Sequence, residues 1–345
     1  MANRTMARSS RRAKTKSGEG FRRQAQKAAR REKAIQRKID RLDARRGKPG
    51  NKKHGMQAGA RRYPEPKLPG QHLSKPGREA DLELKPMYEA PYYQGSDKLR
   101  DMVAIVTGGD SGIGRAVAML FAREGADVAV AYLNEDQDAE ETKRAVENEG
   151  RRCILLPGDV ADPAYCRDAV KKTIDAFGKL DILVNNAAFQ EHADKLEDIS
   201  DEHFDRTIKT NLYGYFNMAK AAVPKMKTGG SIVMTGSVTG LLGNKHLLDY
   251  SLTKGGIHAF ARSLGSQLVD RGIRVNVVAP GPVWTPLNPA DKPAKAVEKF
   301  GGDTPMRRPA QPEEIAPAFV FLAAPSCSSY ITGEILPIIG GYSGG

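Results

Sequence analysis

The sequence predicts an α/β fold in which helices cover both faces of a doubly wound parallel sheet. From residue 102 onward, short and continuous apolar runs alternate with longer segments of helical periodicity. Strands that are apolar throughout are typical of sheets buried on both faces, and their alternation with helices favours parallel crossover connections. At 345 residues, the chain has room for one large domain and an appendage.

The expected elements follow from the apolar runs and from the residues that end them. The first run leads into a glycine-rich turn, and the helix after it places apolar residues on one face and stops at Gly125. Strands are expected at 102–106, 128–131, 153–156, 182–184, 231–235, 275–278 and 335–339. Further helices are expected at 136–149, 163–177, 201–226, 252–270 and 313–322.

Positive charge is concentrated at the N-terminus. Residues 1–62 hold 22 of the 54 Lys and Arg but only 4 of the 41 Asp and Glu, so this segment carries +18 and the remainder −5. We therefore expect a basic low-complexity arm (1–62), a Pro-rich connector (63–98) and an α/β domain (99–345).

The basic arm has too few large apolar residues to fold alone. A 4-3 spacing of small and apolar residues, interrupted at Glu32, predicts at most a transient amphipathic helix. The arm is either a solvated tail or a tether to nucleic acid or an anionic surface, because clustered cations release counterions from phosphates. Its lysines and acidic residues argue against a transit peptide. The residues with the 4-3 spacing are Phe21, Ala25, Ala28, Ile35, Ile39 and Leu42.

Six prolines punctuate the connector, which predicts an extended path over the surface of the domain. Tyr88, Tyr92 and Tyr93 are its expected anchors.

The sequence gives no sign of a membrane span or a metal site. No run of about 20 apolar residues occurs. Cys153, Cys166 and Cys327 are widely spaced and lack a CxxC pattern, which indicates free thiols in a reducing cytoplasm. The six histidines show no ligand spacing, so metal binding is not expected.

A glycine-rich turn separates the first strand from the first helix. Gly108, Gly112 and Gly114 have the spacing Gly-x-x-x-Gly-x-Gly. Backbone N–H groups and the helix dipole at such a turn can hold a pyrophosphate. Glycines also simply form turns, but the position directly after a buried strand favours phosphate binding.

A second pattern joins Ser237, after the 231–235 strand, to Tyr250 and Lys254 at the start of the next helix. The Tyr and Lys lie four residues apart, so both side chains can share one helix face. A nearby ammonium favours the phenolate and lowers the pKa of a tyrosine, which suits proton transfer. Taken alone, a Tyr-x-x-x-Lys pair is more often structural, and the other motifs decide between the two interpretations.

The order of the motifs resembles that of the short-chain dehydrogenase/reductase family over residues 99–345. The connector and the variant glycine motif are similar to a bacterial subgroup with N-terminal extensions, called glucose/ribitol-type dehydrogenases or aldehyde reductases. The resemblance implies a single Rossmann-type domain that interconverts an alcohol and a carbonyl with NAD or NADP. The motifs are Thr107-Gly-Gly-Asp-Ser-Gly-Ile-Gly114, Asp159-Val160, Asn185-Asn186-Ala187, Asn211, Ser237, Tyr250-x-x-x-Lys254 and Pro280-Gly281.

The resemblance also implies roles for individual residues. Tyr250 is the expected general acid/base, Lys254 lowers its pKa and binds the nicotinamide ribose, and Ser237 orients the substrate oxygen. Asn211 is expected to hold a water that relays protons to Lys254, and Asp159 to contact the adenine. The implied cofactor site consists of Gly108, Asp110, Ser111, Gly112, Ile113, Gly114, Tyr132, Asp159, Val160, Asn186, Ala187, Ala188, Tyr250, Lys254, Pro280, Gly281 and Val283.

Two departures from the family pattern bear on the cofactor. Ala188 stands where the family usually has glycine, which is tolerable unless the position needs a positive φ. Tyr132 stands where an Asp would bind the ribose hydroxyls of NAD, and no Arg follows it to hold a 2′-phosphate. Arg115 and the 132–134 turn are the candidates to accept that phosphate, so the preference between NAD and NADP stays open.

The Pro- and Lys-rich segment 284–308 is expected either to close over the substrate as a lid or to form an ordinary surface loop. Candidate pocket residues are Gln190, His192, Leu241 and Trp284. Sugar alcohols, aldehydes and ketones are all compatible substrates. Family members commonly form tetramers, so we expect a homotetramer, and we expect it in the cytoplasm. The alternative is a nucleic-acid or anionic-surface binding protein that carries the α/β domain as a redox-linked passenger.

Overall fold

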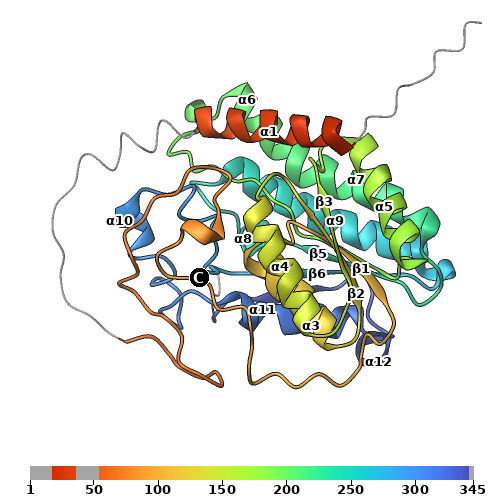
Figure 1. The fold of residues 1–345 in the computed structure, drawn as a ribbon. Helices are drawn as coiled ribbons and strands as arrows, with labels where there is room; N and C mark the ends of the chain where they lie inside the picture. The colour runs from red at the N-terminus through yellow and green to blue at the C-terminus, as the bar shows by residue number, and fades with distance from the viewer. Residues whose placement is uncertain (1–17, 36–53, 342–345) are drawn as a thin grey trace, which may run out of the picture.

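The computed structural model describes residues 18–35 and 54–341 and contains one parallel sheet. Its strands are β1 (Val103–Thr107), β2 (Asp127–Tyr132), β3 (Cys153–Pro157), β4 (Ile182–Asn185), β5 (Ser231–Thr235), β6 (Arg274–Pro280) and β7 (Ile335–Ile338). The strand order is β3-β2-β1-β4-β5-β6-β7, and every pairing is parallel. The chain winds outward from β1 to β3 and then from β4 to β7, which confirms the doubly wound fold (Figure 1). The switch point between β1 and β4 is where such sheets bind ligands.

Helices cover both faces of this sheet. The longer ones are α3 (Gly112–Arg123), α4 (Asp136–Asn148), α5 (Pro163–Phe177), α6 (Asp201–Ile208), α7 (Gly214–Ala222), α9 (Leu248–Leu268) and α11 (Pro312–Ala323). Short ones are α8 (Thr239–Leu242), α10 (Ala294–Val297), α12 (Pro325–Ser328), η1 (Glu79–Asp81), η2 (Leu196–Asp198), η4 (Val223–Lys225) and η5 (Val269–Arg271). Ala104 and Val106 of β1 share a core cluster with α3, α4 and α11, whereas Ile105 shares one with α5, α7 and α9. The period of two along the strand thus divides the core into two layers.

The predicted elements are present with ends that mostly shift by one or two residues, and two helices differ by more. The single helix expected at 201–226 is divided by a π-helical turn, η3 (Lys209–Tyr213), which contains Asn211. The helix expected from 252 begins at Leu248, so Tyr250 lies in its first turn and not before it. The apolar periodicity of the sequence does not mark either feature.

The connector runs extended over the domain, and two of its three expected tyrosine anchors contact the domain. The Tyr93 hydroxyl donates to Glu124, and Arg115 stacks 5.1 Å from the ring centre of Tyr88. The Tyr92 hydroxyl lies 2.9 Å from that of Tyr63, within the connector itself. A small apolar cluster joins the connector to the 284–308 segment. Its buried members are Leu68, Leu73, Leu82, Trp284, Ala290 and Val297.

Part of the basic arm forms a helix, α1 (Gly18–Ile35), which lies against β3 at the edge of the sheet (Figure 1). The exposed fraction of Phe21 is 3%, and its ring meets that of Tyr165 edge-on at 5.6 Å between centroids. The predicted amphipathic face is therefore buried at Phe21, Ala25 and Ala28, with Ala29 beside them. Ile39 and Leu42 lie outside the described residues.

Cys153 and Cys166 are buried free thiols whose pKa values burial raises, and Cys327 is partly exposed. Among the residues that the structure describes, no helix has the length and apolarity needed to cross a bilayer.

Candidate active site

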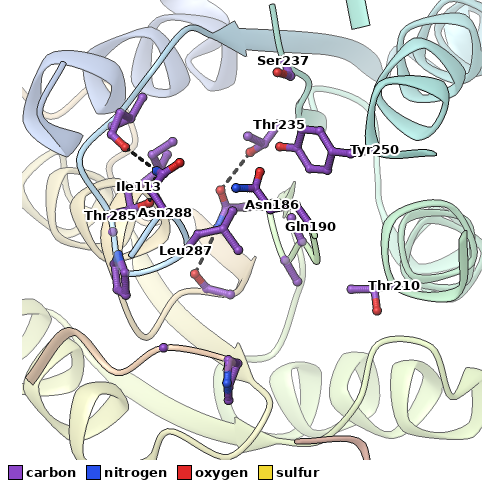
Figure 2. A pocket seen from close by; sticks show the side chains of 18 of the residues that line it. Ile113, Asn186, Gln190, Thr210, Thr235, Ser237, Tyr250, Thr285, Leu287 and Asn288 are labelled. Carbon is purple, nitrogen blue, oxygen red and sulfur yellow. Dashed lines mark hydrogen bonds between the residues drawn. The ribbon is translucent and has the colours of Figure 1, made fainter. Parts of the chain in front are cut away.

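A cavity of about 360 Å³ opens at the carboxyl ends of the central strands. It brings together residues from the glycine turn, the ends of β2 to β6 and the start of α9 (Figure 2). Of the predicted cofactor residues, those that line it are Gly108, Asp110, Ser111, Gly112, Ile113, Tyr132, Asp159, Val160, Asn186, Ala187, Ala188, Tyr250, Lys254, Pro280, Gly281 and Val283. Gly114 and Asn211 do not line it. Pro76, Gly77, Arg206, Thr210, Thr235 and Lys292 do, although the sequence patterns did not single them out.

The glycine turn brings backbone close to backbone at the mouth of the cavity. Gly108 has a φ of +59°, and a Cβ there would lie 3.0 Å from the Cα of Ala187. A Cβ on Gly114 would lie 1.9 Å from the carbonyl oxygen of Gly108. Gly114 therefore permits close packing of α3 on the turn, while Gly108 and Gly112 shape the cavity wall.

Tyr250, Ser237 and Lys254 meet inside the cavity (Figure 2 shows the first two). The Ser237 hydroxyl accepts from the backbone amide and the hydroxyl of Thr239 at 3.1 and 3.0 Å, and the ammonium of Lys254 lies 5.4 Å from the Tyr250 ring centre. Lys254 is fully buried and donates to the carbonyl oxygen of Thr235 at 2.7 Å. A phenol that points into a cavity beside a second hydroxyl can exchange a proton with a bound oxygen.

The pKa values in this cluster differ from the expectation. Burial, followed by the negative charge of Asp291, raises the pKa of Tyr250, and the Ser237 side chain opposes this rise. The pKa of Tyr250 is therefore raised in this structure, contrary to the lowering expected from Lys254, because burial disfavours the phenolate. Burial lowers the pKa of Lys254 itself to about 7.

Asn211 lies behind the cavity wall. Its Nδ2 donates to the carbonyl oxygen of Phe189 at 2.9 Å and to Thr253 Oγ1 at 3.1 Å, and its Oδ1 accepts from the Phe189 amide at 2.8 Å. These bonds tie the π-helical turn to the loop after β4 and to α9. Single π-helical turns are frequent at functional sites.

Asn186 and Ala188 support the end of β4. The Asn186 amide donates to the carbonyl oxygens of Thr107 and Gly108 at 3.1 and 3.0 Å, and its oxygen accepts from Thr235. It therefore fastens β4 to the ends of β1 and β5. Ala188 does not have a positive φ, so alanine is accommodated there without strain.

The residues expected to meet the adenosine end already have partners. Asp159 accepts from Arg206 at 2.9 Å, and the Tyr132 hydroxyl donates to Asp136 at 2.7 Å. Arg206 has no motif of its own in the sequence, and only its approach to Asp159 in space identifies it.

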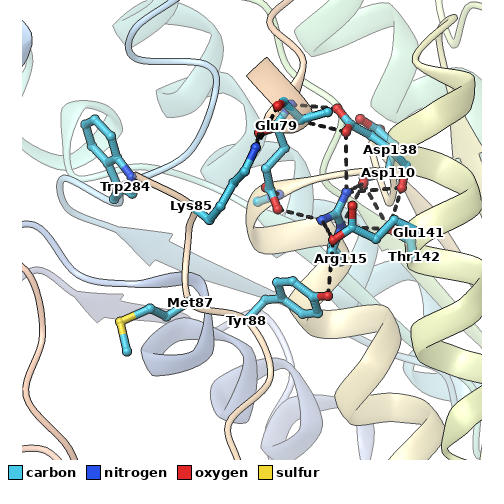
Figure 3. Close-up of polar contacts among 12 residues, drawn as sticks. Glu79, Lys85, Met87, Tyr88, Asp110, Arg115, Asp138, Glu141, Thr142 and Trp284 are labelled. Carbon is cyan, nitrogen blue, oxygen red and sulfur yellow. Dashed lines mark hydrogen bonds and ion pairs between the residues drawn. The ribbon is translucent and has the colours of Figure 1, made fainter. Parts of the chain in front are cut away.

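Arg115, a candidate to accept a 2′-phosphate, is buried in a polar cluster and cannot do so as it stands (Figure 3). It donates to Glu79 and Glu141 at 2.7 and 2.9 Å and to the carbonyl oxygen of Asp110 at 2.8 Å. Glu79, from the connector, also accepts from the Gly112 amide at 2.7 Å and so caps α3. Burial raises the pKa of Glu79 to about 7, against the opposing effects of Arg115 and Gly112.

The predicted pocket residues divide into two pairs. Gln190 and His192 line the cavity, but Leu241 and Trp284 do not. Trp284 is fully buried, and its Nε1 donates to the carbonyl oxygen of Leu84 at 2.8 Å. Its indole therefore holds the connector and does not contact a substrate.

A buried charged cluster, which the sequence patterns missed, stands beside this pocket. Asp291 accepts from Gln190 Nε2 at 3.0 Å and from the His192 ring, and Lys75 Nζ lies 3.6 Å away. Lys292 Nζ lies 2.6 Å from His192 Nε2. The side chains of Lys75 and Asp291 are 3% and 0% exposed, so the connector helps to build this wall.

The cavity fits a dinucleotide. The glycines leave the backbone open where a Cβ would fill the cradle, since one on Gly112 would lie 2.9 Å from Thr285. Glu79 accepts from the amide of Gly112, and the carbonyl oxygen of Ser111 accepts from the amide of Arg115. The amides of Ile113 and Gly114 lie between them in the first turn of α3, before the regular helical hydrogen bonds begin, and suit a pyrophosphate. In the described ranges, no cluster of three His, Cys, Asp or Glu residues is arranged to hold a metal ion.

The chain is similar to a family model and to several known proteins. A family model described as enoyl-(acyl carrier protein) reductase matches residues 108–343. General stress protein 39 of Bacillus subtilis is 50% identical over 81% of this chain and 97% of its own length. NADPH-dependent aldehyde reductase 1 of Arabidopsis thaliana is 46% identical over 78% and 95%, and glucose and ribitol dehydrogenase of Daucus carota 45% identical over 79% and 96%.

Solved structures give the same relationship. A short-chain dehydrogenase from Burkholderia cenocepacia, in complex with NADP, aligns with a TM-score of 0.67 at 33% identity over 71% of this chain and 98% of its own. A blue fluorescent protein from a metagenomic library, in complex with NADPH, aligns with a TM-score of 0.66 at 33% identity over 71% and 99%.

Proposed function

The chain belongs to the short-chain dehydrogenase/reductase family of NAD(P)-dependent oxidoreductases, and we propose that it interconverts an alcohol and a carbonyl with Tyr250 as general acid/base. The observation that carries this proposal is that Tyr250, Ser237 and Lys254 together line the central cavity, with the Lys254 ammonium 5.4 Å from the Tyr250 ring centre. The nicotinamide, when bound, supplies or accepts the hydride.

Four side chains have separate roles in proton transfer and in binding the substrate oxygen. Tyr250 donates its proton to the carbonyl oxygen in reduction and takes it back in oxidation. Ser237 holds that oxygen by a hydrogen bond, and the Lys254 ammonium stabilises the phenolate that Tyr250 becomes. Asn211 keeps the π-helical turn, the loop after β4 and α9 in register, and a water held there would continue the proton path to Lys254.

The cofactor would lie along the carboxyl edge of the sheet, with its pyrophosphate at the glycine turn and its adenosine near Tyr132 and Asp159. We expect NADPH to be preferred, which is supported by the relatives and solved neighbours that carry NADP or NADPH in their names. The names of the relatives also make aldehydes and sugar alcohols the first substrates to test.

The test is a fluorescence titration of the purified protein with NADPH and NADH, followed by assays with a panel of aldehydes, ketones and polyols. Binding of either cofactor together with turnover supports the proposal. Failure to bind both would remove its basis.

The lowered pKa of Lys254 predicts a pH dependence. Lys254 is cationic below about pH 7 and neutral above it, so the charge that stabilises the phenolate is lost as the pH rises. For carbonyl reduction, kcat/KM is expected to fall through this pH, and Lys254→Arg, which stays cationic, should remove the inflection. A wild-type profile without an inflection near pH 7 would contradict the assignment.

Assembly as a homotetramer is supported by exposed apolar side chains on the helices that follow β4 and β5. Tyr213, Phe216 and Leu252 are 57%, 48% and 53% exposed. A cytoplasmic location fits the free thiols of Cys153 and Cys166. Light scattering of the purified chain tests the tetramer, and fractionation of cells tests the cytoplasmic location.

Binding of nucleic acid by the arm is a second candidate role, favoured by the outer face of α1. Arg23, Lys27, Arg30 and Lys33 are all exposed on it. Full-length protein is expected to be retained on duplex DNA at low salt, with retention falling steeply as salt rises, and deletion of residues 1–62 should abolish it. Absence of retention at low salt would exclude this role.

A further inference from the structure

The end of β2, where the adenosine ribose of a dinucleotide lies in this fold, is acidic. Tyr132, Leu133 and Glu135 line the cavity there, and Asp136 and Asp138 follow in the first turn of α4. A ribose 2′-phosphate at this position would meet negative charge. NADP binding at this edge therefore requires a cation near the 132–136 turn.

The cations nearest this end are already engaged. Arg115 is 1% exposed, and its guanidinium is occupied by Glu79 and by the carbonyl oxygen of Asp110. Arg206 lines the cavity but lies on the β3 side, where it is paired with Asp159. The three residues that line the cavity at the end of β2 carry no positive charge; they are Tyr132, Leu133 and Glu135.

Helix α1, which precedes the α/β domain, supplies a cation at the end of β2. The guanidinium of Arg22 forms an ion pair with Asp136 Oδ2, while Asp136 Oδ1 accepts from the Tyr132 hydroxyl. Phe21, the neighbouring residue, is buried against Tyr165 and belongs to the same core cluster as Val160, another cavity residue. The position of Arg22 is therefore fixed by core packing, while the guanidinium itself stays about half exposed at 49%.

We infer that Arg22 is the residue of this chain that accommodates the 2′-phosphate of NADP. It acts in two ways, by neutralising Asp136 and by presenting a positive charge to the phosphate beside Tyr132. This inference rests on the proposed function, since it concerns the same cofactor site. It makes the basic arm a determinant of cofactor choice, supplied by a segment far from every motif of the domain.

The central experiment compares cofactor affinities of the full-length protein by fluorescence titration at low salt. Arg22→Ala is expected to weaken NADPH about tenfold and to leave NADH within about twofold, because only NADPH carries the phosphate. Arg23→Ala, at an exposed position one residue along the same helix, is the matched control and should change neither. Adding Asp136→Asn to Arg22→Ala should restore part of the NADPH affinity, because the repelling carboxylate is gone.

Fragments of the cofactor isolate the adenosine end from the rest of the site. Adenosine 2′,5′-bisphosphate is expected to lose affinity in Arg22→Ala, whereas 5′-AMP is not. Coupling is also reciprocal, so NADPH should protect the arm from trypsin more strongly than NADH does. Phe21→Ala removes the contact of α1 with Tyr165 and keeps the charge of Arg22. It should reproduce the selective loss of NADPH affinity.

The outcomes separate the two proposals. If the wild type binds neither cofactor, the proposed function fails. If it binds cofactor, but Arg22→Ala weakens both cofactors equally or neither, the oxidoreductase assignment stands and the role of Arg22 is refuted.

Discussion

Replacing Tyr250 by phenylalanine is expected to lower turnover by about 100-fold or more and to leave cofactor affinity nearly unchanged. The variant loses only the hydroxyl, and the ring keeps its place beside the Lys254 ammonium. Steady-state rates and cofactor titration, made on the same preparation, separate the two effects.

The matched control is Tyr213→Phe, which removes a hydroxyl from a ring that is 57% exposed on the π-helical turn. It should retain wild-type rates. Near-normal turnover in Tyr250→Phe would show that another group transfers the proton.

Replacing Arg115 by leucine is expected to destabilise the protein by roughly 3–5 kcal/mol, because removing one partner leaves buried carboxylates without compensation. Glu79 and Asp138 have side chains that are 3% and 0% exposed, and both lie within ion-pair distance of this guanidinium. The midpoint of denaturant unfolding measures the effect.

Arg100→Leu is the control, because Arg100 pairs with Asp97 on the surface, with side chains 68% and 55% exposed. Exposed pairs of this kind contribute about 0–1 kcal/mol. Equal losses in the two variants would mean that the buried cluster is not held by Arg115.

The sequence predicts the sheet, and the placement of Tyr250 and Lys254 on one cavity wall, because both depend on local patterns. A strand buried on both faces must be apolar throughout, and a turn that packs against a neighbouring strand must be glycine, as at Gly108 and Gly114. Tyr250 and Lys254 share one helix turn, so their spacing alone brings them together.

Sequence patterns fail to predict the role of a residue where its contacts come from a distant segment of the chain. Arg115 follows a glycine turn and has the charge of a phosphate ligand, but Glu79, 36 residues earlier, occupies its guanidinium. Trp284 has the composition of a pocket residue, yet its indole is bonded to Leu84, 200 residues away. Burial likewise reverses the pKa expected for Tyr250, since desolvation depends on everything packed around the ring.

The buried Lys75–Asp291 contact fixes the connector beside the cavity. All the motifs lie in the α/β domain, but Pro76 and Gly77 of the connector form part of the cavity wall. We therefore expect changes in the connector to alter the shape of the cavity without altering any motif residue. A fragment trimmed to residues 99–345 would keep every motif but would lose Lys75, the Glu79 partner of Arg115 and one side of the cavity wall.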